Sequence, residues 1–202
     1  MRLVLAELKR FGFLLESDPR LPSVCGLIVG EPLRSSWWSH PKAQTIFQVN
    51  ERLEDHTDVF ITKLISAKVT FVHRQLWPEL LAVGSARAEW QMKGLSADAQ
   101  KLLGMVDAKG VLRTDELSWP QSSKAKPGDA ARELEKKLLI VASQIHTESG
   151  AHAKVLETWR HWVKRKALED PKIPAENAIK SLQDRLDKIN AQFGAKARLP
   201  WT

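Results

Sequence analysis

The sequence predicts a mainly helical protein of the α+β class, in which small β-hairpins accompany the helices. Apolar residues recur at helical spacing over much of the 202-residue chain, whereas only a few short runs are rich in β-branched and aromatic residues. One order of elements also occurs twice along the chain: a helix, a short strand, two helices and a hairpin. The expected architecture is therefore two similar units followed by C-terminal helices.

The first unit is expected over residues 1–93. Gly30 is placed to end its second helix, and Pro41 lies where a proline opens a third. A hairpin is predicted from two β-rich runs on either side of Ser66-Ala67, and a connecting helix follows it. The predicted elements cover residues 2–11, 13–15, 23–29, 41–54, 59–65, 68–73 and 77–92.

The second unit is expected over residues 94–158. Ser96 is a suitable cap for its first helix, and Lys109-Gly110 turns the chain into a short strand. A hairpin again ends the unit. The predicted elements cover residues 96–106, 111–113, 114–117, 129–139, 140–147 and 152–158.

Residues 159–202 are expected to form C-terminal helices and a basic tail. The longer helix, residues 175–193, carries an apolar stripe whose spacing alternates between three and four residues, as in a coiled-coil seam. A stripe this apolar is expected to be covered, either by the chain's own units or by a second copy in a homodimer. It consists of Ile179, Leu182, Leu186, Ile189 and Phe193.

The composition excludes several classes of protein. A hydrophobic fraction of 43% with 27% charged residues is typical of a globular chain. No apolar run approaches the roughly 18 residues of a membrane helix, and Glu7 interrupts the stretch that a signal peptide needs. Cys25 is the single cysteine, which argues against a disulfide framework or a thiolate metal cluster. We therefore expect a cytoplasmic protein, nucleoid-associated if the source is bacterial, that needs no cofactor.

The charge of the chain favours a polyanionic partner. The net charge is +7 and the isoelectric point is about 9.6. Such a balance favours nucleic acid first, and acidic membrane or protein surfaces second. Double-stranded DNA is the expected partner, and no association with a membrane is expected.

The order of elements over residues 1–158 resembles that of the winged-helix superfamily, in tandem. This resemblance implies a helix-turn-helix in which the third helix of a unit reads DNA and the hairpin is a wing. Tandem units are also similar to the bacterial DNA glycosylases that excise alkylated and cross-linked bases. Those enzymes use a Gln-x-Gln or Gln-x-Asp pair. The nearest segments here begin at Gln44, Gln48 and Gln144 and lack that form, so no catalytic residue is transferred.

The third helix of the first unit has two distinct faces at 100° per residue. The face expected to pack inward is apolar and consists of Ala43, Ile46, Val49 and Leu53. The opposite face carries side chains that can contact base edges in the major groove: Gln44, Thr45, Gln48 and Arg52. The corresponding helix of the second unit carries Glu133 and Glu135, which makes it the poorer reader of DNA.

Cationic side chains beside the first wing and on the basic helix are the expected phosphate contacts. Lys63 and Lys68 flank the tip of the predicted first hairpin. In the basic helix, neighbouring tryptophans are expected to pack while Arg160, Lys164 and Arg165 project as a stripe. The alternative for both groups is an ordinary solvated surface.

The loop before the third helix contains two adjacent tryptophans, Trp37 and Trp38. They cannot both point into one core from a regular element, so one is expected to be exposed as a base-stacking group beside Arg34, His40 and Lys42. The alternative is that both fill the space between helices. If the protein has a reaction centre, this loop is the first candidate, with Trp38 and His40 as its catalytic residues.

A metal site is not expected. His146, Glu148 and His152 come together at the second predicted hairpin, but their spacing matches no zinc signature. Nucleotide-binding, serine-hydrolase and metalloprotease motifs are absent from the sequence.

The sequence thus predicts a DNA-binding protein that acts through tandem winged-helix units, as a transcription regulator or a DNA-maintenance factor. One alternative is a base-excision repair enzyme, a DNA glycosylase-like hydrolase with the tryptophan loop at the lesion. The other is an adaptor for protein interactions, because fold alone does not determine function. The sequence does not establish catalysis.

Overall fold

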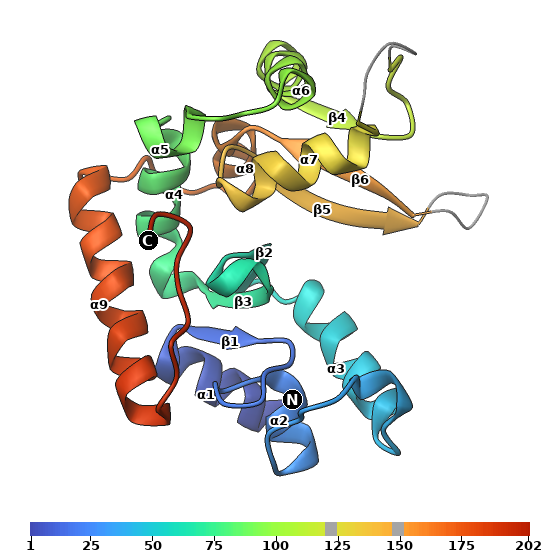
Figure 1. Ribbon diagram of the computed structural model, residues 1–202, viewed down its shortest axis with the longest axis vertical. Coiled ribbons are helices and arrows are strands. Elements are labelled where there is room, and N and C mark those ends of the chain that lie inside the picture. The colour runs from blue at the N-terminus through green and yellow to red at the C-terminus, as the bar shows by residue number, and fades with distance from the viewer. Residues whose placement is uncertain (120–124, 147–151) are drawn as a thin grey trace. The chain divides into compact units, whose positions relative to one another are not determined.

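The computed structural model describes residues 1–119, 125–146 and 152–202. Helices and two small antiparallel sheets make up the fold, which confirms the α+β class (Figure 1). The chain divides into two compact units. The first unit combines Met1–Glu79 with Glu176–Thr202, and the second unit is Leu80–Ala175. The sequence predicts a boundary after residue 93 instead, with residues 159–202 as a separate segment.

The first unit has the element order that its sequence predicts. The N-terminal part of this unit contains the helices α1 (Arg2–Phe11), α2 (Val24–Val29) and α3 (Ala43–Glu54), and the strands β1 (Phe13–Leu15), β2 (Val59–Lys63) and β3 (Val69–His73). The strands form one antiparallel sheet in the order β1-β3-β2. Gly12 closes α1 in the left-handed conformation, which turns the chain directly into β1.

The turn between β2 and β3 is held by the C-terminal tail. Ser66 and Ala67 both have positive φ values, 51° and 56°, although neither residue favours that conformation. The N–H of Ser66 donates to the carbonyl of Arg198 at 2.7 Å, and the N–H of Arg198 donates to Oγ of Ser66 at 3.2 Å. These tertiary bonds stabilise a turn that local preference alone disfavours.

Helix α9 (Ala175–Phe193) has the bounds that the sequence predicts. Leu182, Leu186 and Ile189 are buried within the single chain, and Phe193 contacts Phe11 edge to face with ring centroids 5.6 Å apart. The tail after α9 turns back alongside it (Figure 1). The apolar stripe is therefore covered largely by the first unit itself, which leaves little of it for a dimer seam.

The second unit contains the helices α5 (Glu89–Met92), α6 (Ala97–Lys109), α7 (Pro127–Lys136) and α8 (Trp159–Arg165). Its strands, β4 (Val111–Arg113), β5 (Val141–His146) and β6 (His152–Glu157), form an antiparallel sheet in the order β4-β6-β5. Leu102, Val106, Leu134 and Leu156 are fully buried members of its core.

The helix predicted at residues 114–117 is absent, and a turn stands there instead. Thr114 is tied to β6 on both sides: its N–H donates to the carbonyl of Lys154, and its Oγ1 accepts the N–H of Lys154, each at 2.9 Å. Pairing with a distant strand therefore replaces the local helical tendency of this segment.

The predicted connecting helix at residues 77–92 is divided into α4 (Trp77–Ser85) and α5. Arg87 has a positive φ of 49° at the break. The fully buried side chain of Gln91 accepts the N–H of Ala88 at 2.8 Å and donates to the carbonyl of Lys137 at 3.0 Å. The second of these bonds fixes α5 within the second unit.

Candidate nucleic-acid interface

Helix α3 separates its apolar and polar side chains as the sequence predicts. Ile46, Val49 and Leu53 are buried, and Ala43 is half-buried at their edge. The four side chains of the predicted reading face are all exposed: Gln44, Thr45, Gln48 and Arg52. The helix therefore presents to solvent four side chains that can contact the edges of bases.

Lys42, a predicted DNA contact, and His40, a candidate catalytic residue, fix the beginning of α3. Nζ of Lys42 donates to the carbonyls of Ile28 and Val29 at 3.0 and 3.2 Å, and so caps the C-terminal end of α2. Nδ1 of His40 accepts the N–H of Lys42 at 3.1 Å, and the His40 carbonyl accepts the N–H of Ala43 at 2.8 Å. Lys42 and the half-buried His40 thus orient α3 against α2.

The adjacent tryptophans differ sharply in exposure. Trp37 is buried, whereas Trp38 keeps 66% of its surface exposed, and the two rings stack with centroids 3.9 Å apart. Phe47 of α3 is also exposed and lies 6.4 Å from Trp38, centroid to centroid. We call Trp38 and Phe47 the aromatic platform. It lies next to the reading face and has Trp37 as its buried support.

A carboxyl group that sequence reasoning missed lies beneath this platform. Glu16, which follows β1, is half-buried and accepts a hydrogen bond from the Trp37 side chain. Nδ2 of Asn50 in α3 donates to Oε1 of Glu16 at 3.3 Å. Burial raises the pKa of Glu16, with the Trp37 bond opposing the shift. Glu16 therefore connects β1, the tryptophan loop and α3. A lone acidic residue after an apolar run gave no signal of this role.

We expect Glu16→Gln to be at least as stable as the wild type at neutral pH. Because the folded pKa of Glu16 lies above its ordinary value of 4.5, the fold favours the protonated form. Its contribution to the free energy of unfolding is fully present below that ordinary value and is lost as the pH rises through the folded pKa. Glutamine keeps the acceptor oxygen without the charge.

Urea denaturation at acidic and neutral pH measures this difference. The stability advantage of Glu16→Gln over the wild type should grow as the pH rises. Glu31→Gln removes an exposed carboxylate from the same unit and serves as the control. A Glu16→Gln protein that loses stability at neutral pH would contradict the expected cost of burying this carboxylate.

Charges around α3 are not uniform. Glu51, Glu54 and Asp55 are exposed at its C-terminal end, beside Arg52. Arg34 is exposed in the loop before the helix, and no carboxylate lies between Arg34 and the first turn of α3. The carboxylates disfavour phosphates, so the N-terminal half of α3 and its preceding loop are the better side for DNA.

The cations of the first hairpin are used within the fold. Nζ of Lys68 lies 2.7 Å from Oδ2 of the buried Asp18, and Lys63 is half-buried. Burial by itself raises the pKa of Asp18, but hydrogen bonds from the Leu21 N–H and from Lys68 lower it below its ordinary value. Lys68 thus neutralises a buried carboxylate, which reduces its value as a phosphate contact.

The predicted basic stripe on α8 is likewise divided. Arg160 and Lys164 are exposed. Arg165 instead forms a bidentate pair with Glu157, through Nε at 3.0 Å and Nη2 at 2.7 Å, and Glu157 is buried. Of the three cations, only Arg160 and Lys164 project into solvent without an ion pair to a described residue.

A family model described as "AlkZ related" matches residues 4–198. The chain belongs to the AlkZ-related family. This family relates to the DNA glycosylase-like protein AlkZ, which suggests a role in DNA interaction or DNA repair. Comparisons with curated proteins and with solved structures gave no significant match.

Membership in the AlkZ-related family does not by itself assign a catalytic residue here. Gln44 and Gln48 lie exposed on α3, and Gln144 lies exposed on β5. The predicted cluster at His146, Glu148 and His152 falls outside the residues whose side chains the structure describes. Within the described part of the chain, no group of three His, Cys, Asp or Glu residues could hold a metal ion. No helix in that part is long and apolar enough to cross a membrane.

Proposed function

We propose that this member of the AlkZ-related family binds double-stranded DNA through α3 and the aromatic platform, and that this binding is part of base repair. The observation that carries the proposal is the exposed Trp38, 66% open to solvent and stacked on the buried Trp37 beside the reading face of α3. An exposed indole held by a second ring is suited to stack on a base that has left the helix.

The topology of the first unit supports the same proposal. The order α1-β1-α2-α3-β2-β3, with the sheet order β1-β3-β2, is the arrangement in which a winged helix places its third helix in the major groove. The exposed Gln44, Thr45 and Gln48 are suited to contact base edges there. The net charge of +7 supplies the general attraction to phosphates.

The aromatic platform favours repair over transcription regulation. A regulator reads paired bases through their edges and has no need of an exposed stacking surface. A protein that recognises damaged DNA gains from such a surface, because a damaged or mismatched base costs less to unstack. If the protein cleaves the bond between the base and its sugar, the reaction is a hydrolysis. The general base of that reaction should then be sought among the residues near the aromatic platform.

Fluorescence anisotropy with two duplexes tests the proposal. One duplex is fully paired, and the other carries a single mismatched base at its centre. We expect the wild type to prefer the mismatched duplex, and Trp38→Ala to lose about 1–3 kcal/mol of binding to it because one stacking contact is removed.

Leu3→Ala provides the matched control, because Leu3 is another exposed apolar side chain of the first unit. It should bind both duplexes as the wild type does. If the folded Trp38→Ala protein also retains the wild-type preference, the aromatic platform is not the recognition surface. If the wild type binds neither duplex at low salt, DNA binding itself is excluded.

A further inference from the structure

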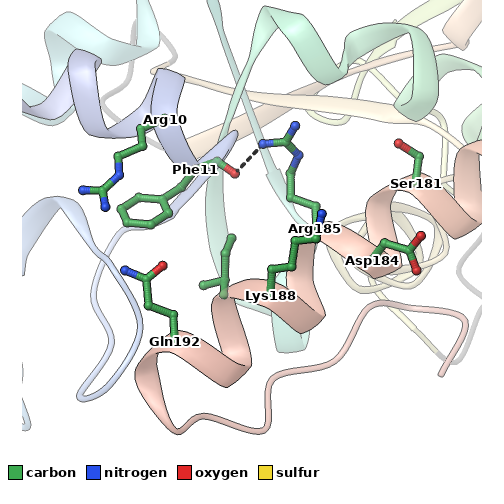
Figure 2. A pocket seen from close by; sticks show the side chains of 8 residues that line it. Arg10, Phe11, Ser181, Asp184, Arg185, Lys188 and Gln192 are labelled. Atoms are coloured by element: carbon green, nitrogen blue, oxygen red, sulfur yellow. Dashed lines mark hydrogen bonds between the residues drawn. The ribbon is translucent and has the colours of Figure 1, made fainter.

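A hollow of about 450 Å³ lies between the C-terminal end of α1 and the side of α9, within the first unit (Figure 2). Arg10 and Phe11 line it from α1, and a row of α9 side chains between Ser181 and Gln192 lines it from the other side. In Figure 1, α9 lies to the left of the first sheet and α3 to its right. The hollow is therefore distinct from the proposed DNA-reading face.

The charge in this hollow is predominantly positive. Arg10, Arg185 and Lys188 line it, whereas Asp184 is the one carboxylate among its lining residues. Asp184 is already paired with Lys180 at 2.6 Å. Within the described part of the chain, no hydrogen bond or ion pair engages Nζ of Lys188. The hollow therefore has positive charge available to bind an anion.

Two of the three cations are held in place. Nη1 of Arg185 donates to the carbonyl of Phe11 at 3.2 Å, and its aliphatic stem packs at Gly12, where an added Cβ would come within 3.1 Å of Cδ. The guanidinium of Arg10 lies over the Phe11 ring, 4.9 Å from its centroid, and pairs with Glu7 at 3.2 Å. Figure 2 shows Arg10 and Arg185 on either side of Phe11.

Three cations around one hollow suit a multiply charged oxyanion such as phosphate better than a singly charged carboxylate or a neutral ligand. Guanidinium groups bind phosphate oxygens through several donors at once, and a flexible ammonium adds a point charge. The amide of Gln192 lies at the same opening and can donate to a further oxygen. The Ser181 hydroxyl contributes less, because it already bonds Oε1 of Glu79 at 3.3 Å.

We propose that the hollow between α1 and α9 binds a phosphate group, to which the positive charges of Arg10, Arg185 and Lys188 contribute. The group belongs either to a nucleic-acid backbone or to a small phosphate compound, since the three cations recognise the chemistry that both share. The proposal does not depend on DNA reading by α3, and the first arm of its test contains no DNA.

The first arm is a titration of the full chain with inorganic phosphate at constant ionic strength, followed by calorimetry. We expect saturable binding to the wild type, weakened about ten- to hundredfold in the double variant Arg10→Gln/Lys188→Gln, because two charge-assisted contacts are lost. Lys101→Gln, an exposed lysine on α6, is the charge control and should bind phosphate as the wild type does. Circular dichroism of each variant verifies that it is folded.

The second arm identifies the source of the phosphate. If a DNA backbone occupies the hollow, log affinity should fall less steeply with log salt for the double variant than for the wild type. The magnitude of the slope should decrease by about two, close to one for each lost contact. An unchanged slope together with lost phosphate binding assigns the hollow to a small phosphate compound. If neither phosphate binding nor the salt slope distinguishes the double variant from Lys101→Gln, the proposal is overturned.

Discussion

Gly84→Ala should destabilise the protein by about 1–3 kcal/mol or more, although alanine is the better helix former. Gly84 lies in α4, and a Cβ added to it would stand 2.1 Å from Cε2 and 2.3 Å from Nε1 of Trp159. Such distances require either the helix or the indole to move. The gain of about 1 kcal/mol that alanine usually brings to a helix interior is too small to offset that clash.

The indole of Trp159 has little freedom to move away. It is buried, its Nε1 donates to the carbonyl of Leu138 at 2.7 Å, and its ring meets Trp162 edge to face at 5.7 Å. Shifting Trp159 would therefore break a buried hydrogen bond and disturb a second large side chain. Close packing of helix α4 against Trp159 is the reason for glycine at position 84.

Gly104→Ala gives the matched comparison. Gly104 lies within α6, is exposed, and has no atom within 4 Å of an added Cβ. The same substitution should there stabilise the protein by about 0.5–1 kcal/mol through helix propensity alone. Urea denaturation of both variants measures the two effects. Equal stability of Gly84→Ala and Gly104→Ala would show that Trp159 does not pack against Gly84.

Periodic helices were the most predictable part of this fold. α3 and α9 bury the stripes that their spacing indicates, because one side of each helix meets the core and the other meets solvent. The turn at residues 114–117 could not be predicted in the same way. Its conformation depends on Lys154 in β6, and no local pattern contains that partner.

The candidate site was predictable in its residues and less so in their roles. Adjacent tryptophans indicate that one is exposed, but only the packing of Trp37 near Glu16 determines that it is Trp38. Lys42 and Lys68 look like phosphate contacts in the sequence. In the fold, Lys42 caps α2 and Lys68 pairs with a buried carboxylate. A cation is assigned to a ligand only after its own partners are known.

Arg165→Met should destabilise the protein by about 2–4 kcal/mol, whereas Lys164→Met should not. The two residues are neighbours on α8 and each substitution removes one positive charge. Arg165 forms a bidentate pair with Glu157, whose side chain is 3% exposed, while Lys164 is exposed. Removing Arg165 leaves a buried carboxylate with the His161 ring, 2.8 Å away, as its remaining side-chain hydrogen-bond partner among the described residues.

The loss should also depend on pH. Burial by itself raises the pKa of Glu157, but hydrogen bonds from Arg165 and His161, with their charges, hold it below its ordinary value of 4.5. Glu157 therefore stabilises the wild type above that value and loses its contribution as the pH falls through the folded pKa. The difference in the free energy of unfolding between the wild type and Arg165→Met should be largest at neutral pH. It should decrease on acidification, because a protonated Glu157 no longer needs a cation.

Thermal or urea denaturation across that pH range measures this difference, with DNA binding as the second readout. The stability of Arg165→Lys should lie between that of the wild type and that of Arg165→Met, since lysine restores the charge without the bidentate geometry. Lys164→Met should instead weaken DNA binding at unchanged stability if the exposed cations of α8 contact phosphates. Should Arg165→Met be as stable as Lys164→Met at neutral pH, the Glu157–Arg165 pair contributes nothing to the fold, and Arg165 returns to the set of surface cations that can bind DNA.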